Sequence, residues 1–553
     1  MNDRQTSVVA DKGHTHEVFN QATPLENYNP ASADLALQAG VKHHGGGWGL
    51  ADINRYGALT GRADNILLGF QANAVKPEFN THDRFGRRVD EVSYHPAYHQ
   101  LMQMALEEGL HADAWLDPTP GAQVVRAAKS YLQAQLEPGH GCPLTMTFAS
   151  VPTLRLTPSL ADKWLPKILA KHYDPRNVPF TDKQAVTIGM GMTEKQGGSD
   201  VRANTTRATP LGAEGAGELY ELVGHKWFLS APMCDAFLML AQAPQGLSCF
   251  LVPRWREDGS KNPLEVQRLK NKMGNVSNAS SEVELRGAHG WLVGEPGRGV
   301  PAIIEMVAMT RFDCMVGSSA LQRQAVVQAV HHCRERAAFG QTLIDQPLMQ
   351  NVLADLHLEQ RGSLAITLRM AASLDRMDDA QEQLLRRLGL AVGKYWICKR
   401  TPLLTYEAME CLGGNGVMEN CILPRLYREA PINAIWEGSG NVQALDILRA
   451  LAKEPAVLDA WFAELDKTPH PLLTAAKARI MQLLASSERE LLARQLADTL
   501  ALSMQGALLL QQDADIAELF LRSRLAGEGV RQFGTLPAGF DLSTLLQQSL
   551  VFD

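Results

Sequence analysis

Several separate stretches of the sequence combine hydroxyls, glycines and aromatic rings in patterns that suit a flat, polar ligand. The densest is residues 189–200, where a flexible backbone carries the hydroxyls of Thr193 and Ser199. It is not a dinucleotide fingerprint, because Glu194 takes the place of the last glycine in G-x-G-x-x-G, and it is not a P-loop. Local sequence alone favours a loop that links helical and β regions.

Two further stretches carry an aromatic pair and an arginine. Residues 224–230 form an aromatic strand that ends in the hydroxyl of Ser230, although aromatic pairs in strands are more often core residues. Residues 336–340 place Arg336 at the end of a long helical pattern, just before Gly340. An arginine near a helix C-terminus is favoured by the helix dipole in any case, so neither stretch is decisive alone.

A carboxylate stands between an indole and a glycine-rich turn in residues 435–441. Glu437 follows Trp436 and precedes Gly438, Ser439 and Gly440. In an apolar setting such a carboxylate has a raised pKa and can act as a general base. The same carboxylate is equally suited to cap the helix that follows.

The elements that must position these groups fall into four blocks. The first 180 or so residues are helical with loops, and residues 1–48 resemble an arm or connecting loop. Short β-rich runs fill residues 186–293, and helical spacing resumes over 301–338, 346–375 and 451–553. Strands gathered in one block predict a compact sheet or barrel rather than a βαβ fold. The predicted domains are 1–185, 186–293, 294–449 and 450–553.

Composition is typical of a folded protein of several domains. The chain has 553 residues, of which 45% are apolar and 20% charged, and its net charge is −7. No secretory signal or membrane-length apolar run is visible, and the eight cysteines form no CxxC pair, so we expect a cytoplasmic protein without a metal. His95 and His99 have i,i+4 spacing but no third ligand, and the pairs at 43–44 and 331–332 are expected at the surface.

Taken together, the order and spacing of these motifs resemble the acyl-CoA dehydrogenase superfamily over residues 95–450. The motifs are Thr-Glu-x-x-x-Gly-Ser-Asp, the aromatic strand, Arg-x-x-Phe-Gly, Gly-Gly-Asn-Gly and Trp-Glu-Gly-Ser. Residues 192–201, 224–228 and 15–21, with the extra hundred residues at the end, are similar to the AidB branch. Lys195 stands where ordinary members usually have proline. That branch is known as an alkylation-response flavoprotein that also binds DNA.

The resemblance implies a fold and a cofactor. The fold is a helical N-terminal domain, a central β-barrel and a helical bundle, with an additional C-terminal helical domain in this chain. FAD would lie between barrel and bundle, with Thr193 at the flavin pyrimidine edge, Ser230 near N5 and Phe228 over the ring. Arg336 matches the arginine that reaches the FAD pyrophosphate, often of a neighbouring subunit, which implies a homotetramer. The full expected cofactor set is Met190, Gly191, Met192, Thr193, Ser199, Phe228, Ser230, Arg336, Trp436, Gly438, Ser439 and Asn441.

The resemblance also implies the chemistry. Glu437 matches the family base that removes the α-proton of an acyl-CoA while a β-hydride passes to flavin N5. Some members place the base on an earlier helix, but residues 309–312 offer no carboxylate there. Arg311 matches an arginine near the thioester, and Ser199 lies where members touch the pantetheine arm. The expected substrate is a small or branched acyl-CoA, while the acyl chain and the electron acceptor stay open.

Two classes of function remain: a working dehydrogenase, and a DNA-associated protective flavoprotein with vestigial dehydrogenase activity. Residues 450–553 hold nine Lys or Arg against thirteen Asp or Glu, so this segment is not a basic domain. Basic side chains can still gather on one face. The expected contacts to duplex DNA are Arg449, Arg522, Arg524 and Arg531, with Arg479, Arg489 and Arg494 on a neighbouring helix. The alternative for this segment is a helical oligomerisation or capping domain.

Overall fold

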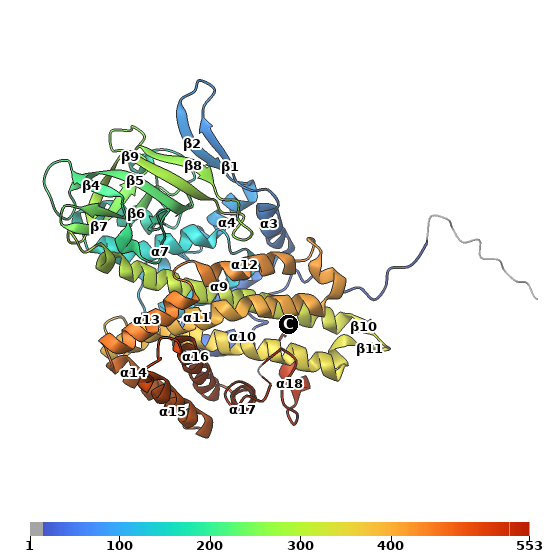
Figure 1. Ribbon diagram of the computed structural model, residues 1–553. Helices are drawn as coiled ribbons and strands as arrows, with labels where there is room; N and C mark the ends of the chain where they lie inside the picture. The colour runs from blue at the N-terminus through green and yellow to red at the C-terminus, as the bar shows by residue number, and fades with distance from the viewer. Residues whose placement is uncertain (1–14, 530, 552–553) are drawn as a thin grey trace, which may run out of the picture.

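The strands lie in one block between two sets of helices, as the sequence predicts. The structure is a computed structural model that describes residues 15–529 and 531–551. In Figure 1 the barrel occupies one end of the molecule, and the long helices of the bundle cross beneath it toward the opposite end. The C-terminal helices pack on the outer side of this bundle. The expected fold class is therefore confirmed.

The N-terminal region is helical with one β-hairpin. Its helices are α1 (Leu35–His43), α2 (Leu50–Thr60), α3 (Ala63–Ala74), α4 (Pro96–Glu107), α5 (Asp113–Leu116), α6 (Ala122–Leu136), α7 (Gly141–Arg155) and α8 (Pro158–Ile168), and its hairpin pairs β1 (Glu78–His82) with β2 (Arg88–Ser93). Helix α1 corrects the expectation that residues 1–48 form an irregular arm. The carboxylate of Asp34 accepts a hydrogen bond from the amide of Leu37 at 3.0 Å and so caps this helix.

The β block closes into a barrel of seven strands. They are β3 (Ile188–Gly191), β4 (Arg207–Pro210), β5 (Leu219–Ser230), β6 (Ala236–Ala243), β7 (Gly246–Pro253), β8 (Leu264–Leu269) and β9 (Ser280–Val293). The ladder runs β3-β6-β4-β5-β9-β7, the pairing of β6 with β7 closes it, and β8 pairs with β9. Strand β6 is buried on both faces except at Gln242, which fits its continuous apolar run.

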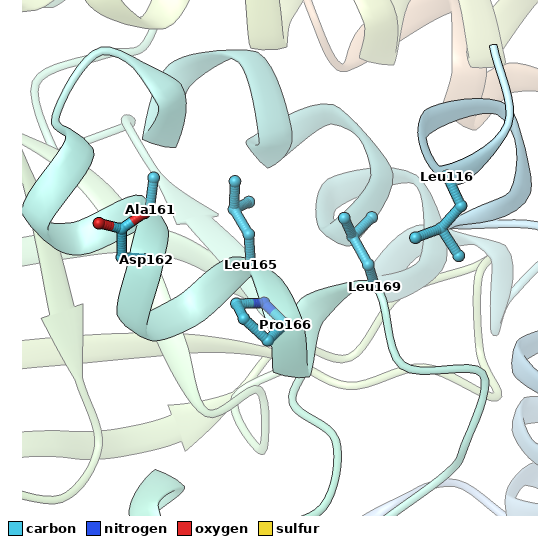
Figure 2. A pocket seen from close by; sticks show the side chains of 6 residues that line it. All are labelled: Leu116, Ala161, Asp162, Leu165, Pro166 and Leu169. Atoms are coloured by element: carbon cyan, nitrogen blue, oxygen red, sulfur yellow. The ribbon is translucent and has the colours of Figure 1, made fainter.

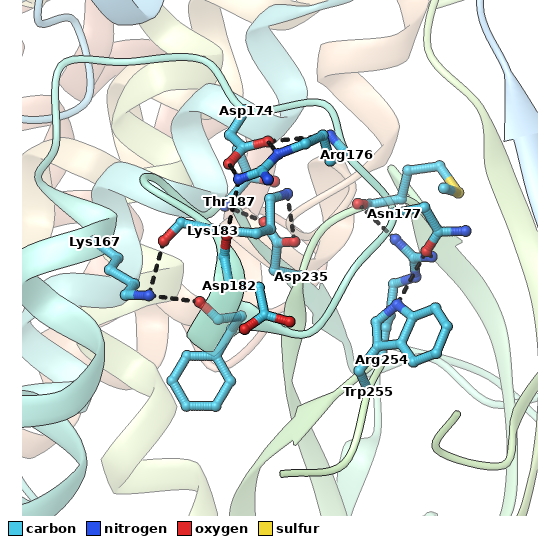
Figure 3. A network of polar contacts seen from close by, with 12 residues as sticks. Lys167, Asp174, Arg176, Asn177, Asp182, Lys183, Thr187, Asp235, Arg254 and Trp255 are labelled. Atoms are coloured by element: carbon cyan, nitrogen blue, oxygen red, sulfur yellow. Dashed lines mark hydrogen bonds and ion pairs between the residues drawn. The ribbon is translucent and has the colours of Figure 1, made fainter. Parts of the chain in front are cut away.

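A buried polar network joins the barrel to the segment that leads into it from α8 (Figure 3). Lys183 donates to Asp235 at 2.7 Å, and the other carboxylate oxygen of Asp235 accepts from the amide of Thr187 at 2.8 Å. The indole of Trp255 donates to Asn177 at 3.0 Å. These contacts fix the start of β3, and therefore the loop after it that carries Thr193.

The bundle is built on one long helix. Helix α9 (Gly299–Glu335) has 37 residues, which corresponds to about 55 Å. It packs against α10 (Pro347–Leu374), α11 (Ala380–Cys411) and α12 (Leu423–Ile435), and α12 is followed in the chain by α13 (Gly440–Lys453). A small hairpin of β10 (Ala337–Ala338) and β11 (Gln341–Thr342) extends from the C-terminal end of α9. His331 and His332 on α9 are buried, against the expectation of surface positions, because the N-terminal segment covers this end of the helix.

The terminal helices are α14 (Ala456–Leu465), α15 (Pro471–Ala485), α16 (Ala493–Leu510), α17 (Ala514–Arg524) and α18 (Leu542–Gln547). The last residues lie along the bundle, where Arg334 donates to the carbonyl of Leu550 at 2.7 Å. Short 3-10 helices occur at Gly47–Gly49, Phe180–Asp182, Val201–Ala203, Leu343–Asp345 and Gly413–Val417. Among the helices of residues 15–529 and 531–551, none has the length and apolarity that crossing a membrane requires.

Candidate functional site

Glu437 lies in the turn between α12 and α13 and does not cap the following helix through its side chain. Its backbone has φ 56°, the left-handed region that non-glycine residues adopt at an energetic cost. The hydroxyl of Thr310 on α9 donates to the Glu437 carboxylate at 2.9 Å. Thr310 falls within residues 309–312, where some family members carry the base, so in this chain that neighbourhood supplies a donor to Glu437 instead.

Buried side chains hold three consecutive carbonyls of this turn. The ammonium of Lys394, on α11, donates to the carbonyls of Trp436 at 2.7 Å and Gly438 at 2.5 Å. The amide of Gln443 donates to the carbonyls of Glu437 and Gly438, each at 3.0 Å. We call Lys394 and Gln443 the turn clamp. It fixes the backbone on both sides of Glu437 in the conformation that aims the carboxylate at Thr310.

Arg311 supports the same turn. Its Nε donates to the carbonyl of Glu437 at 3.1 Å, and its Nη1 pairs with Asp446 at 2.9 Å. Arg387 pairs with the same carboxylate at 2.8 Å. The sequence placed Arg311 beside the substrate, and the structure places it beside the base with these groups already engaged. Its visible role is therefore to hold the turn.

The environment of Glu437 suits a general base. Burial raises the pKa of its carboxyl, and this outweighs the opposing effects of the Thr310 hydroxyl and of the Lys394 and Arg311 charges, so the pKa stays above its ordinary value. A carboxylate with a raised pKa takes up a proton more readily than an ordinary glutamate. Glu437 is therefore equipped to accept a proton from a carbon acid.

The loop after β3 is anchored by Glu194. Its buried carboxylate pairs with Lys226 at 2.9 Å and accepts from the hydroxyl of Thr206 at 2.6 Å and the amide of Thr205 at 2.7 Å. Burial alone would raise the pKa of Glu194, but Lys226 and these donors outweigh it and hold the pKa at about 2. The amide of Trp227 donates to the carbonyl of Thr193 at 2.8 Å. Glu194 thus supplies the anchor that keeps Thr193 against β5.

The end of β5 and the turn of Glu437 are linked through Cys142. Ser230 lies beside Cys142, at the start of α7. Burial raises the pKa of the Cys142 thiol to about 11, while Lys272 lowers it and the Glu437 carboxylate raises it, so both charges lie near the thiol. Ser230 and Glu437 therefore border one region, to which the barrel contributes a hydroxyl and the bundle a carboxylate.

Exposed aromatic rings suit the flat ring system that the resemblance implies. Phe228 is 46% exposed, although its strand neighbours Lys226 and Leu229 are buried. Phe339, at the tip of the β10–β11 hairpin, is 99% exposed. The Lys270 ammonium lies 4.5 Å from the centre of the Phe228 ring, and the rest of this exposed ring, two residues before Ser230 in β5, is a surface that a planar ligand would cover. The residues of this chain thus fit a flavin.

Arg336 lies far from Glu437 within this chain. It follows the last residue of α9, about 37 Å along the helix from Arg311, and the hairpin beside it projects away from the barrel (Figure 1). Its guanidinium donates to the carbonyl of Asn20, and the Asn20 side chain bonds the backbone of Ala337 at 2.8 and 2.9 Å. The N-terminal segment that resembles the AidB branch therefore supports this arginine.

The other expected cofactor residues have varied surroundings. Gly191 lies in β3, where a Cβ would come within 2.9 Å of Leu229, so the backbone approaches its neighbour closely. Ser199 is in an exposed loop. The side-chain oxygen of Asn441 accepts from Arg494 at 2.9 Å. The remaining residues are all partly buried: Met190, Met192, Trp436, Gly438 and Ser439.

The structure corrects one of the expected DNA contacts. Arg524 is buried and pairs with Asp355 and Glu359 of α10, so it is unavailable to a phosphate. Its position on the inner face of α17 is the physical reason. Arg522 is partly exposed and pairs with Glu528 at 2.6 Å. The side chain of Arg449 is 61% exposed, and Arg531 is also exposed.

Two hollows lie outside this region. One, of about 390 Å³, is bordered by α8 and the end of α5 and is almost entirely apolar (Figure 2). A larger one, of about 630 Å³, lies under residues 21–30 and reaches His331 and His332. His95 caps α4 by accepting from the amide of Ala97, and His99 bonds the hydroxyl of Tyr173, so these two histidines have structural partners.

Sequence reasoning missed the turn clamp. Lys394 is 42 positions before Trp436 in the chain, and Gln443 is one of many polar residues in the helix after the base. The one available signal was a lone lysine in the apolar run 388–398, since a buried lysine needs partners. In the sequence, residues 309–312 were considered only for a carboxylate, so the hydroxyl of Thr310 was not recognised as a partner of Glu437.

With this geometry in place, the chain can be compared with known proteins. Residues 20–175 match the domain described as the adaptive response protein AidB N-terminal domain. Residues 189–288 match the acyl-CoA dehydrogenase middle domain, and residues 297–452 match the acyl-CoA dehydrogenase C-terminal domain. Together these matches follow the order of the N-terminal helices, the barrel and the bundle.

Individual relatives agree with the domain matches. "Putative acyl-CoA dehydrogenase AidB" of Escherichia coli is 48% identical over 447 residues, covering 80% of this chain and 82% of that one. "Acyl-CoA dehydrogenase family member 11" of Caenorhabditis elegans is 30% identical over 505 residues, covering 84% and 80%. The crystal structure of C. elegans ACDH-11 in complex with C11-CoA has a TM-score of 0.83 at 27% identity, covering 93% and 94%. The resemblance drawn from the motifs is thereby confirmed.

Proposed function

The chain belongs to the acyl-CoA dehydrogenase family of oxidoreductases, in its AidB branch, and we propose that it is a working dehydrogenase whose base is Glu437. The observation that carries the proposal is the Glu437 carboxylate, withdrawn from bulk water, bonded to Thr310 and held by the turn clamp. A vestigial site has no need of so many buried polar partners for one turn.

The chain's own residues account for the proton transfer. The carboxylate of Glu437 removes the α-proton of the acyl thioester, and the electron pair of that C–H bond forms the double bond between Cα and Cβ as a hydride leaves Cβ. Members of this family are FAD-dependent, and FAD, when bound, accepts this hydride. Thr310 holds the carboxylate toward the substrate, and Arg311 with Lys394 favours its ionised form before the proton is taken.

We assign the cofactor contacts to two protomers. Thr193, Phe228, Ser230 and the backbone of 438–441 would hold the flavin end; the anchoring of Thr193 against β5, which carries Phe228 and Ser230, supports this assignment. The distant Arg336 would reach the pyrophosphate of a neighbouring protomer's FAD, which requires a homo-oligomer, for which we propose a tetramer. Charge-assisted bonds from arginine to phosphate are among the stronger hydrogen bonds.

The substrate is proposed to be a small or branched acyl-CoA. Support comes from the family and from the relative solved with C11-CoA, although that ligand is longer than the class proposed here. Ser199, exposed in the loop after Thr193, is placed to meet the pantetheine arm. A panel of acyl-CoAs added to the FAD-loaded protein, with bleaching of the flavin absorption as the readout, would identify the chain length.

Glu437→Gln tests the base. The variant keeps the shape of the side chain but cannot accept the proton, so the rate of flavin reduction by the best acyl-CoA should fall ~10²–10⁴-fold with FAD still bound. Glu419→Gln is the matched control, since Glu419 is an exposed glutamate of the same region that pairs with Arg428. Reduction of Glu437→Gln at the wild-type rate would assign the base elsewhere.

Mixed oligomers test the shared cofactor site. Glu437→Gln lacks the base and Arg336→Ala lacks the pyrophosphate contact, so each oligomer alone should reduce poorly. Co-expressed, they form some sites in which an Arg336→Ala protomer supplies Glu437 and its neighbour supplies Arg336, and part of the activity should return. If the mixture is no better than the two separate variants, both residues serve one protomer's site.

Association with duplex DNA is the second candidate, and the exposure of three of the four expected arginines favours it. Arg449, Arg522 and Arg531 are at least partly exposed, whereas Arg524 is not. If these side chains neutralise phosphates, the logarithm of the DNA affinity should fall linearly with the logarithm of the salt concentration, with a slope of ~0.9 for each phosphate contacted. Replacing Arg449 and Arg531 together should then reduce the slope by about two. If the slope is the same in wild type and in the double variant, these arginines do not contact phosphates, and an oligomerisation or capping role is favoured for this region.

A further inference from the structure

A lysine two hydrogen bonds away from Ser230 has only uncharged hydrogen-bond partners. Lys272 belongs to the loop between β8 and β9, and its ammonium donates to the carbonyl of Asn278 at 2.8 Å, the hydroxyl of Ser280 at 3.0 Å and the side chain of Asn275 at 3.2 Å. These three bonds use all three ammonium hydrogens. An ammonium taken out of bulk water without a carboxylate bonded to it is costly, so a structural role alone would be better served by a neutral donor.

One of these bonds continues toward the site. Ser280, the first residue of β9, faces Ser230, the last residue of β5, in the strand register, and their hydroxyl oxygens are 3.0 Å apart. An ammonium can only donate, so the Ser280 oxygen accepts from Lys272 and its own proton is free for Ser230. The Ser230 oxygen is then an acceptor on this side, and its own proton is directed away from Ser280, to the side on which Cys142 of α7 lies.

Ser230 is the residue that we have placed next to the flavin N5, so any role of its hydrogen-bond partners toward the flavin rests on the proposed function. We propose that Lys272 is a positioning residue for the flavin: through Ser280 it sets the direction of the Ser230 proton toward N5 and brings a positive charge near the ring. A flavin gains electron density on reduction, and both a hydrogen bond and a nearby cation stabilise that extra density. Lys272 should therefore favour the reduced form of the bound cofactor.

Charged and titratable groups on the neighbouring elements determine the pH range in which Lys272 is protonated and can favour the reduced flavin. Burial lowers the pKa of Lys272 to about 8, although the charges of Cys142 on α7 and Glu429 on α12 oppose this effect and raise the pKa. Burial raises the pKa of Glu429 to about 7, and Cys142 with its raised pKa stays neutral. Lys272 is thus protonated below a pH of about 8, where it favours reduction, and loses this effect as the pH rises further.

The test measures the reduction equilibrium of the FAD-loaded protein against a reference dye, without any acyl-CoA. At about pH 6.5, Lys272→Met should lower the ratio of reduced to oxidised flavin about tenfold, the order expected for losing a hydrogen bond from a charged group. Since tenfold for two electrons is about 30 mV, it is easily resolved. At about pH 9.5 wild type and Lys272→Met should agree within about twofold, because the wild-type lysine is then neutral.

Three further variants give the result its meaning. Lys261→Met is the matched control: burial lowers the pKa of Lys261 also to about 8, and it too lies in a barrel loop, but its ammonium bonds neither serine, so this variant should follow wild type. Ser280→Ala keeps the cation but breaks the chain, so it should lose most of the tenfold effect. Lys272→Arg keeps its charge and should retain the effect at pH 9.5, and it also serves if Lys272→Met binds FAD poorly.

Defined outcomes overturn the proposal. A Lys272→Met ratio equal to wild type at pH 6.5, or a Lys261→Met ratio that falls equally, would remove any special role of Lys272. A Ser280→Ala ratio equal to wild type would show that the serine chain is not the route. Failure of the proposed dehydrogenase is distinguishable from these results, because it would appear in the acyl-CoA bleaching experiment and leave the dye equilibrium unaffected.

Discussion

Replacing Lys394 with methionine tests the turn clamp. The substitution removes two bonds from a buried ammonium, to the carbonyls of Trp436 at 2.7 Å and Gly438 at 2.5 Å; the Trp436 carbonyl loses its side-chain donor, while the Gly438 carbonyl keeps Gln443. Hydrogen bonds to charged groups contribute ~1.5–3 kcal/mol each. Because methionine regains some apolar packing, we expect the turn to lose about 3 kcal/mol of local stability, which is a substantial part of what keeps Glu437 at φ 56°.

Two assays measure this loss. Hydrogen exchange in peptides that span residues 435–443 should accelerate by about a hundredfold, since each 1.4 kcal/mol is tenfold. Flavin reduction at saturating acyl-CoA should slow by about the same factor, because a displacement of about 1 Å in a catalytic group costs on the order of 10² in rate. Because Gly438 belongs to the backbone that we propose to hold the flavin end, the reduction rate is expressed per bound FAD.

Lys453→Met is the control, because Lys453 is the last residue of α13, ten positions beyond the measured segment, with an exposed side chain. It should leave both the exchange of 435–443 and the reduction rate within about twofold of wild type. If Lys394→Met also exchanged and reduced at wild-type rates, the turn would be held by its own backbone and by Gln443, and the assigned role of Lys394 would be refuted.

Three shorter predictions concern pH and buried charge. Because the pKa of Glu437 is raised, the rate of flavin reduction should fall with decreasing pH around a pKa above the ordinary 4.5, as stopped-flow reduction across a pH series will show. Because the pKa of Glu194 is lowered to about 2 in the folded chain, its ionised form adds stability that is complete above about pH 4.5 and is lost as the pH falls toward 2. Glu194→Gln should therefore have a lower Tm than wild type at neutral pH. Its Tm should also change less than that of wild type between about pH 5 and 3. Arg524→Met strands the carboxylate of Asp355 and should cost ~3–5 kcal/mol, seen as a lower Tm, while the salt dependence of any DNA binding stays unchanged.

The fold was predictable because its signals are local and repeated. Helical spacing over 301–338 and 346–375 found α9 and α10 almost to their ends, and the short β-rich runs found the barrel. Helix α1 was missed because its boundaries lie in a polar, turn-rich stretch, where the cap from Asp34 is a weaker signal than the surrounding glycines. Even so, the family's motifs located Glu437 directly.

The support around the site was not predictable, because it depends on pairs that are far apart in the chain. Lys394 and Trp436 meet only because α11 packs against the turn, and no local pattern encodes that contact. Arg524 shows the converse: an arginine next to the C-terminus of a helix looks exposed in sequence, and only the packing of α17 on α10 shows that Asp355 neutralises it.

Arg323, buried in the middle of α9, has consequences for how the chain folds during synthesis. Its guanidinium pairs with Asp34 at 3.1 Å and donates to the carbonyls of Ala33 at 2.9 Å and Ser549, near opposite ends of the chain. Until Ser549 has left the ribosome, this charge lacks one of its partners, and α9, which carries Thr310 and ends just before Arg336, is not fully packed. Domains often fold in order as they emerge, but the middle of α9 reaches its full set of partners only after residue 549 has been made. A chain that stops before residue 549 is therefore expected to keep every residue of the barrel while the Arg323 guanidinium in the bundle loses one of its carbonyl partners.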